Sequence, residues 1–589
     1  MGSETYVIDT EVYKDYFLLC FRNVETGSTG HYELLPGGTF PLTDLPPVTM
    51  VSFNGNHYDF PMLSLALSGA DTATIKAASD DIILGGLKPW HVDDKYGGRD
   101  LSHHDHIDLI EVAPGLAGLK IYGGRMHSKR LQDLPFDPSA SITPEMRPLL
   151  REYCMNDLQT TIDLYQKLQP QIGLRVTMSA EFGIDLRSKS DAQIAEAVIR
   201  SEVEKRIGHR VYRPELHPQY SFTYNVPAFI QFQTPGMRQA LDIIRKQQFT
   251  LKADGSVELP KILESMRLRI GHGIYRMGIG GLHSSETCVA HRANDHTRLI
   301  DRDVTSYYPS IILTQGLYPS HLGESFLEVY RSLVERRIAA KRAGEKVMAD
   351  ALKICVNGSF GKLGSKWSVL YSPDLLIQVT LTGQLALLML IELIEGLGIP
   401  VVSANTDGVV VKCPVSRQDE LGAIISAWEI VSGFETEETE YTALYSKDVN
   451  NYIAIKPDGK TKLKGLYAQG GMQKNPSNEI CVDAAISYLT KGTPVDVAIL
   501  DCTDARRFIT IRQVKGGAVY DGAYLGKAVR WYYAKGETRH IAYATNGNKV
   551  ARSDGARPLM ELPEALPADI DYQWYTAEAM SILSDVGAA

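Results

Sequence analysis

Residues 298–313 read RLIDRDVTSYYPSIIL. The apolar stretch 299–303 predicts a strand that ends on Asp303 and runs into a helix. A second stretch, PVVSANTDGVVVKC at 400–413, has a polar centre between two apolar arms. It predicts a hairpin whose turn carries Asp407. Because Asp303 and Asp407 lie 104 residues apart in the sequence, only the fold can bring their carboxylates together.

The N-terminal third carries a second group of acidic residues. Asp9 and Glu11 in YVIDTEVY lie two apart on a predicted strand, so both carboxylates point to the same face. Asp59 follows in FNGNHYDFP, and Tyr153 precedes Asp157 by four residues on a predicted helix, which places that pair on one face. Like charges on one face repel each other unless a cation or a proton lies between them.

Composition limits the class of protein. A chain of 589 residues with 44% apolar residues is expected to fold into three to five domains, and it is not disordered. The most apolar run, 386–394, is too short for a membrane span and contains Glu392. We therefore expect no membrane partner and, because no secretory signal opens the chain, a cytoplasmic location. The 7 cysteines include no C-x-x-C pair, which predicts reduced thiols and no zinc or iron–sulfur site.

The net charge of −9 is unevenly placed along the chain. Residues 1–110 are strongly acidic, whereas 331–366 and 506–549 each carry 9 basic side chains against 3 and 2 acidic ones. This pattern favours a body that binds a polyanion, joined to a carboxylate-rich unit.

The acidic residues of the first third resemble the motifs of DnaQ-like 3′–5′ proofreading exonucleases, as found in family B DNA polymerases. The expected patterns D-x-E, N-x(2–3)-(F/Y)-D and Y-x(3)-D stand here, in order, as Asp9/Glu11, Asn54 to Asp59, and Tyr153 to Asp157. The resemblance implies that the four carboxylates hold two Mg²⁺ ions, that Tyr153 orients the attacking water and that Asn54 contacts DNA. Lys120 is a further candidate for stabilising the phosphate.

The C-terminal half resembles the polymerase motifs of the same family. Motif A corresponds to Asp303 through Ser310, motif B to LKICVNGSFGKLG at 352–364, and motif C to SANTDGVVV at 403–411. Asn405 replaces the first aspartate of motif C, and Asp407 fills the second. The resemblance implies a catalytic pair, Asp303 and Asp407, that binds two Mg²⁺ ions together with the Val304 carbonyl.

The same resemblance assigns binding residues. The nucleotide is expected to contact Tyr308, as the steric gate against a ribose 2′-OH, and Arg337, Lys341, Lys353, Asn357 and Gly361. Arg336 is the alternative to Arg337 if the register slips by one residue. Besides Asn54, the resemblance implies DNA contacts at Lys447, Tyr452 and Lys464. Position and charge alone favour further DNA contacts at Arg512, Lys515 and Arg530. Asn450 stands where the family's primer-contacting lysine is expected, and Lys447 is a candidate to compensate.

The expected fold class is a multidomain α/β and α+β protein, an RNase H-like exonuclease domain followed by a right-hand polymerase. Its expected parts are the exonuclease domain (1–190), a connecting region (191–285), palm (286–325), short fingers (326–372), palm again (373–470) and a thumb or C-terminal region (471–589). Individual elements are expected too: a helix near 146–168, two helices at 326–342 and 349–360, and a hairpin around 457–459.

The function expected from these residues is DNA-templated DNA synthesis with proofreading, of bacteriophage type. The expected cofactor is Mg²⁺, two ions per site, with Mn²⁺ as a substitute. The expected partners are primer-template DNA and dNTPs, with a helicase or a single-strand-binding protein as further candidates. Three alternatives stay open: a protein-primed polymerase, a 3′–5′ exonuclease with a weak or inactive polymerase half, and a non-catalytic replication scaffold. Clustered like charge argues against the scaffold, and the short intervals from Asp303 to Lys353 and from Asn357 to Asp407 argue against protein priming.

Overall fold

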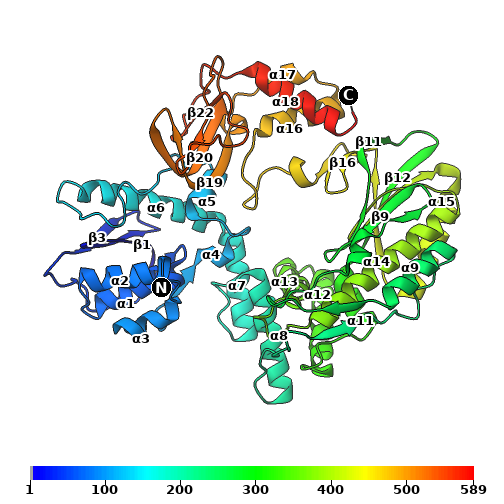
Figure 1. Ribbon diagram of the computed structural model, residues 1–589, viewed down its shortest axis with the longest axis horizontal. Helices are drawn as coiled ribbons and strands as arrows, with labels where there is room; N and C mark the ends of the chain where they lie inside the picture. The colour runs from blue at the N-terminus through cyan, green and yellow to red at the C-terminus, as the bar shows by residue number, and fades with distance from the viewer. Residues whose placement is uncertain (1–3, 589) are drawn as a thin grey trace.

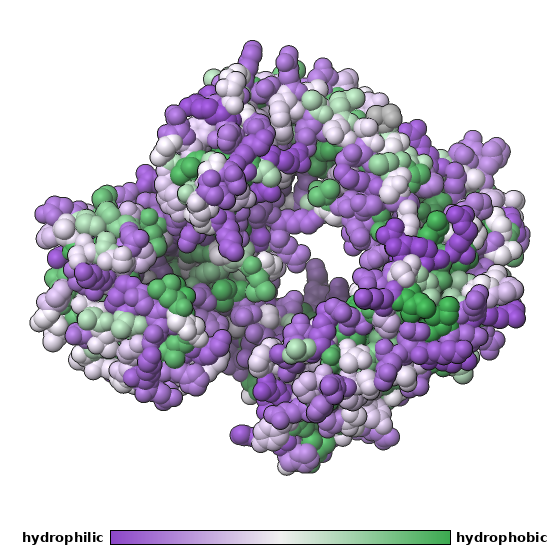
Figure 2. Space-filling view, in the orientation of Figure 1, coloured by the Kyte–Doolittle hydropathy of each residue, from purple (hydrophilic) through white to green (hydrophobic). Residues whose placement is uncertain are grey.

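The computed structural model describes residues 4–588, and it shows a mixed α/β protein built around several separate sheets. The domains follow one another around a ring, with the N-terminal domain at the left, the central sheet at the right and the C-terminal domain at the top (Figure 1). The space-filling view shows an opening through the middle of this ring (Figure 2). The chain therefore presents an inner rim formed by domains that are far apart in the sequence.

The N-terminal domain is a five-stranded sheet of order β3-β2-β1-β4-β5. The long central strand β1 pairs antiparallel with β2 and parallel with β4, so Asp9 lies opposite Cys20. Helix α6 packs on β1 and β2, which confirms the helix predicted near 146–168. The strands are β1 (Thr5–Tyr13), β2 (Tyr16–Asn23), β3 (Thr29–Leu34), β4 (Thr49–Ser52) and β5 (His106–Asp108), and the helices are α1 (Asp59–Leu67), α2 (Thr72–Ile83), α3 (Val92–Tyr96), α4 (Leu109–Val112), α5 (Leu119–Arg125) and α6 (Arg147–Lys167).

A connecting region joins this domain to the central one. Helix α8 begins at a capping box formed by Ser190 and Gln193 and packs on α12 and α13. The remaining elements include a two-stranded sheet of β6 and β7, and their apolar side chains share one hydrophobic core with the central domain. The elements are α7 (Gln169–Phe182), α8 (Asp191–Ile207), β6 (Ser221–Thr223), α9 (Pro235–Arg245), β7 (Gln248–Thr250) and α10 (Lys261–Ser265).

The central domain is a seven-stranded sheet of order β15-β12-β14-β13-β10-β9-β8. Its strands are β8 (Leu268–Ile270), β9 (Gly273–Met277), β10 (Leu282–Ser284), β12 (Thr297–Val304), β13 (Val401–Asn405), β14 (Gly408–Pro414) and β15 (Thr436–Tyr441). Strands β13 and β14 form the hairpin predicted at 400–413, and β12 is the strand predicted at 299–303. Strands β8 to β10 also belong to this sheet, although the sequence assigned their residues to the connecting region 191–285.

The helices of the central domain build its core. Helix α14 is long and apolar enough to cross a membrane by length and composition, but 89% of its apolar window is buried inside the protein, so it is a core helix. Helices α12 and α13 confirm the helix pair predicted within 326–360, and Gly344 joins them at φ 75°. The helices are α11 (Tyr307–Thr314), α12 (Glu324–Ala343), α13 (Lys346–Lys362), α14 (Pro373–Gly396) and α15 (Gln418–Ser432).

A four-stranded sheet of order β11-β16-β17-β18 leads to the C-terminal domain. Its strands are β11 (Thr287–Arg292), β16 (Ala443–Asp448), β17 (Asn451–Ile455) and β18 (Thr461–Leu463), and the β17–β18 pair confirms the hairpin predicted around 457–459. The C-terminal domain combines a four-stranded sheet with three helices: β19 (Thr510–Tyr520), β20 (Ala523–Tyr533), β21 (Ala542–Tyr543), β22 (Ala556–Pro558), α16 (Glu479–Lys491), α17 (Val495–Leu500) and α18 (Tyr572–Asp585).

The ring closes where the C-terminal sheet packs on helix α5 of the N-terminal domain. Ile511 lies so close to Gly124 that a Cβ there would approach it to 2.7 Å. Arg530 is 0% exposed, and its guanidinium donates to four carbonyl oxygens: those of Ser128 (2.8 Å), Lys129 (3.0 Å), Leu559 (2.6 Å) and Met560 (3.0 Å). Arg530 therefore links the C-terminal domain to the N-terminal domain. This buried structural role differs from the DNA contact expected from its charge.

Replacing Arg530 by alanine should loosen this closure. The change leaves four carbonyl oxygens, one buried and three partly buried, without their donor, which is expected to cost roughly 3 kcal/mol. The melting temperature should fall. Limited proteolysis should cut more readily at 128–129 and 559–560, the two segments that Arg530 holds together. Lys527→Ala on the same strand is the control, because that side chain is exposed. Equal stability of the two variants would contradict the role given to Arg530.

Candidate active sites

The N-terminal sheet gathers four carboxylates. Asp9 and Glu11 lie on the same face of β1, Asp59 begins α1, and Asp157 lies in α6. Ligand atoms of Asp9, Glu11 and Cys154 all lie within 4.8 Å of one another. Asp59 is 3% exposed. The structure thus brings together all four acidic residues that the sequence singled out.

Burial and mutual repulsion raise the pKa values of Asp9, Glu11 and Asp59. Desolvation, followed by the charge of Asp157, raises the pKa of Glu11 from 4.5 to about 8. Desolvation also raises the pKa of Asp59 to about 7, against the hydrogen bond from the Thr10 hydroxyl (2.6 Å). The pKa of Asp9 is raised as well, by burial and then by Asp59. Oxygen donors with this much uncompensated negative charge fit hard divalent cations such as Mg²⁺.

One lysine offsets part of that charge. The Lys120 ammonium donates to the Asp157 carboxylate (2.8 Å) and to the Tyr153 hydroxyl (2.5 Å), so it joins the two residues that lie four apart on α6.

Asn54 lies on the loop before α1 at φ 70°, and its backbone N–H donates to the Asp108 carboxylate (2.8 Å). Asp108 is 1% exposed and also accepts from Asn56 (2.9 Å), so it shapes the Asn54 loop. Sequence reasoning did not single out Asp108.

The second site forms on the central sheet. Asp303 on β12 lies opposite Gly408 on β14, and the Val304 N–H donates to the Asp407 carbonyl oxygen (2.7 Å). A Cβ at residue 408 would lie 2.1 Å from a carboxylate oxygen of Asp303, so a side chain there would force the Asp303 carboxylate to move. The pKa values of Asp303 and Asp407 are both raised, by desolvation first and also by the charge of Asp301. Here too the carboxylates fit a divalent cation.

A cavity of about 420 Å³ opens on one side of this pair. Tyr308, Arg337, Lys353 and Asn357 all line it, as the sequence predicted, whereas Lys341 and Gly361 do not. Arg337 donates to the Ser306 hydroxyl (3.0 Å), and the neighbouring Arg336 instead pairs with Glu181, which settles the register of α12.

The aromatic wall of this cavity is fixed. Tyr308 stacks on Phe360 with ring centroids 4.0 Å apart, and its hydroxyl donates to the Gly280 carbonyl oxygen (2.9 Å). Tyr307 is buried beneath it and donates to the Gly383 carbonyl oxygen (2.5 Å). Tyr308 is therefore the tyrosine held at the mouth of the cavity.

A second cavity, of about 470 Å³, opens beside the same pair. Tyr452 and Lys464 line it as the sequence predicted, together with Asp301 and Lys462, which sequence reasoning missed. Asp301 had a detectable signal, since it lies two residues before Asp303 on one strand and therefore shares its face. Lys462 stands in the same relation to Lys464, but only tertiary packing brings β18 close to β12, so its contact with Asp303 had no sequence signal.

Other sequence-predicted residues lie elsewhere. Lys447 forms an ion pair with Asp585 of α18 (2.6 Å) and does not line either cavity. The Asn405 amide donates to the Val449 carbonyl oxygen (3.2 Å), so it braces the neighbouring turn. Glu437, on β15 opposite Asp303, lines the first cavity and was not predicted.

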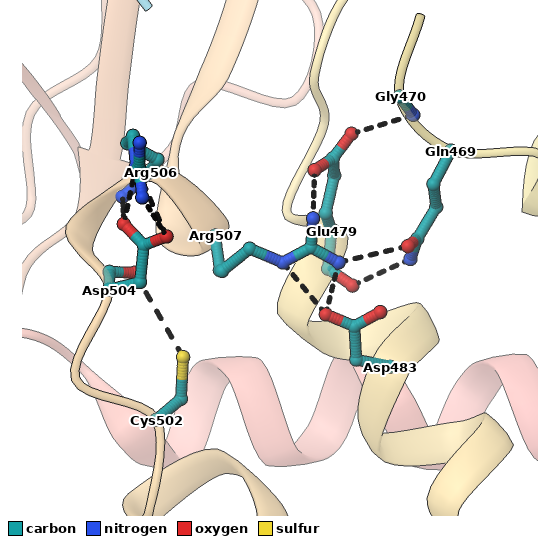
Figure 3. A network of polar contacts seen from close by, with 8 residues as sticks. All are labelled: Gln469, Gly470, Glu479, Asp483, Cys502, Asp504, Arg506 and Arg507. Atoms are coloured by element: carbon teal, nitrogen blue, oxygen red, sulfur yellow. Dashed lines mark hydrogen bonds and ion pairs between the residues drawn. The ribbon is translucent and has the colours of Figure 1, made fainter.

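The basic C-terminal segment uses much of its charge internally. Arg507 donates to Glu479 and Asp483 of α16 and to Gln469 (2.9 Å), and Arg506 pairs with Asp504 (Figure 3). Arg512 donates to the Ala551 carbonyl oxygen (2.5 Å). Lys515 is exposed, and within residues 4–588 no ion pair engages its side chain. Of the three predicted DNA contacts here, Lys515 has the most accessible charge.

Comparisons with known proteins relate part of the chain to DNA polymerases. DNA polymerase II of Escherichia coli is 30% identical over 29% of this chain and 27% of that protein. DNA polymerase 1 of Sulfurisphaera ohwakuensis is 26% identical over 22% of the chain and 15% of that protein, and DNA polymerase 1 of Aeropyrum pernix is 29% identical over 21% and 13%. These matches show homology to DNA polymerases, and the matched part is about a quarter or less of each relative's length.

The comparisons with family models and with solved structures do not narrow the class of protein further. No family model matches the sequence. The solved structure of the family B DNA polymerase from Pyrobaculum calidifontis covers 100% of this chain and 78% of its own, with 16% identity and a TM-score of 0.41. A TM-score of this size does not establish a shared fold.

The raised pKa values of the N-terminal cluster predict how stability depends on pH. A carboxyl group whose pKa is higher in the folded state stabilises the fold below its unfolded pKa, and this stabilisation is lost as the pH rises through the folded value. In a chelating buffer, the melting temperature should therefore fall between about pH 4 and pH 8, the window set by Glu11 and Asp59.

Mg²⁺ or Mn²⁺ should restore this stability more at pH 8 than at pH 5, because the ion replaces the protons. Calorimetry can measure both effects, together with the protons released on metal binding. Glu11→Gln is the matched variant and should flatten the pH dependence. A variant with the same pH profile as the wild type would contradict the assignment.

Proposed function

We propose that the chain is a DNA-templated DNA polymerase of family B with a 3′–5′ proofreading exonuclease. The proposal rests on two clusters of mutually repelling carboxylates, one at the N-terminal sheet and one at the central sheet, in a chain homologous to DNA polymerases. Both clusters fit divalent cations. One cluster adjoins a cavity with fixed cations and a tyrosine wall, as synthesis requires. The other carries a tyrosine and a lysine beside its carboxylates, as hydrolysis of a phosphodiester requires.

In synthesis, Asp303, Asp407 and the Val304 carbonyl would hold two Mg²⁺ ions, which supply charge stabilisation for in-line phosphoryl transfer. Arg337 and Lys353 line the first cavity and would bind the triphosphate oxygens. Asn357, one turn beyond Lys353 on α13, would contact the nucleotide from the same helix face. The rings of Tyr308 and Phe360 would form the floor beneath the sugar.

In proofreading, Asp9, Glu11, Asp59 and Asp157 would hold the ions. Burial and the nearby carboxylates raise the pKa of Tyr153, so its hydroxyl keeps its proton and can donate to an attacking water. Lys120 would keep Tyr153 and Asp157 in place and would neutralise charge that develops on the phosphate.

The domain roles follow as proposals. Residues 1–190 form the exonuclease domain, the central sheet with β11 and β16–β18 forms the palm, and α12 and α13 form short fingers. The C-terminal domain serves as the thumb, with Lys515 as its accessible DNA contact. We further propose a bacteriophage replication enzyme of the host cytoplasm that extends an ordinary nucleic-acid primer with dNTPs. It would work beside a helicase or a single-strand-binding protein.

The two activities should separate by mutation. Asp303→Ala or Asp407→Ala should lower primer extension by roughly 10³-fold, which corresponds to about 4 kcal/mol of lost transition-state stabilisation, and should spare degradation of single strands. Asp9→Ala combined with Glu11→Ala should do the reverse. Primer extension and single-strand degradation of labelled DNA, with and without Mg²⁺, measure both. Near-normal synthesis by Asp407→Ala would refute the polymerase site.

Sugar discrimination should depend on Tyr308. Shortening the side chain to valine removes the ring that would clash with a 2′-OH, so ribonucleotide incorporation should rise relative to deoxyribonucleotide incorporation, by about tenfold or more. Tyr307→Phe is the control, because it keeps the buried ring and removes only a hydroxyl that faces Gly383. Unchanged discrimination in Tyr308→Val would place the gate elsewhere.

A further inference from the structure

Two cavities share the carboxylates of the central sheet. Asp303, Thr406 and Asp407 line both, while the fixed cations Arg337 and Lys353 line only the first. Nucleotidyl transfer joins two substrates that approach one metal centre in line from opposite sides. If the first cavity receives the triphosphate, the second faces the strand that is being extended.

Lys462 reaches this second cavity from the neighbouring sheet. It lies on β18 opposite Ala454 of β17, and the small buried side chain of Ala454 leaves room for the lysine to extend toward β12. The Lys462 ammonium lies 3.0 Å from Asp301 and 3.3 Å from Asp303. The side chain is 31% exposed, so the ammonium can also contact a ligand in the cavity.

Asp301 fixes that ammonium. The carboxylate of Asp301 is 5% exposed, and it accepts from the Tyr441 hydroxyl and from Lys462 on the same oxygen. An ammonium has three donors. If a cation engaged Asp303, the Lys462 ammonium could keep one hydrogen bond to Asp301 and would have donors left for an anion in the cavity.

We propose that Lys462 binds the phosphate at the 3′-terminal linkage of the primer, and that Asp301 is the residue that positions Lys462 for this contact. The inference rests on the proposed polymerase function. The charges on the cavity wall support it, since Lys462 and the neighbouring Lys464 both line a space whose carboxylates would be engaged by cations during transfer. A strand with an anionic phosphate beside its terminal hydroxyl matches this arrangement.

The test measures binding of a recessed-end primer-template without dNTPs, in Mg²⁺ and in a background with Asp9→Ala and Glu11→Ala. Lys462→Met should weaken binding about tenfold or more and reduce the salt slope by about one unit. Lys462→Arg should restore most of the affinity. Lys460→Met is the matched control, because that lysine is 81% exposed, pairs with Asp458 and lines neither cavity.

Asp301→Asn should also weaken binding, and in the Lys462→Met background it should add almost nothing, because it acts through Lys462. A primer with a neutral methylphosphonate at its 3′-terminal linkage should bind the wild type more weakly than the ordinary primer does. Lys462→Met should bind the two primers with equal affinity. The KM for the primer should rise in both variants, while the KM for dNTPs stays the same.

Additive losses, full affinity in Lys462→Met, or a wild type indifferent to the methylphosphonate would overturn the inference. The methylphosphonate arm needs no variant of this site, so it decides even if Asp301→Asn misfolds. A wild type that extends primers while these tests fail refutes only this inference. A wild type that extends no primer refutes the proposed function as well.

Discussion

The pairing of β12 with β14 is the contact on which the central site depends. It sets Asp303 opposite Gly408 and joins Val304 to Asp407 through a backbone hydrogen bond of 2.7 Å. A shift of one residue in this register would turn Asp303 to the other face of the sheet. The missing side chain at Gly408 makes room for the Asp303 carboxylate. A register defined by the backbone therefore places the carboxylates before any ion or substrate arrives.

Both sites hold several negative charges close together and offset part of that charge with lysine. Each holds carboxylates close together, where desolvation and neighbouring charges raise their pKa values, and each has at least one lysine that reaches in from a different element. Lys120 comes from α5 and Lys462 from β18, and each lies within hydrogen-bonding distance of an acidic residue and a tyrosine or a second acid. These lysines offset only part of the negative charge, so both clusters would favour a bound divalent cation.

Local sequence patterns were enough to predict the carboxylates, the hairpin at 400–413 and the helix pair joined at Gly344, because each depends on spacing within a few residues. Partners that meet only through tertiary packing could not be predicted, as Lys462 illustrates. Charge was a poor guide in the C-terminal segment, where Arg530 binds carbonyl oxygens inside an interface and Arg507 binds α16. Composition reports that an arginine is present, but only the fold decides whether its charge faces solvent.

The closure through Arg530 also bears on how the chain is made. Ser128 and its donor Arg530 are separated by 402 residues, so the N-terminal side of this interface leaves the ribosome long before its partner is synthesised. At about 5–20 residues per second, the delay is roughly 20–80 s. During that time Ile121 and Leu131, which later pack with Ile511, have no cover from the C-terminal sheet. The nascent N-terminal domain thus exposes an apolar surface until the C-terminal sheet covers it. Truncated translation products would leave that surface exposed permanently.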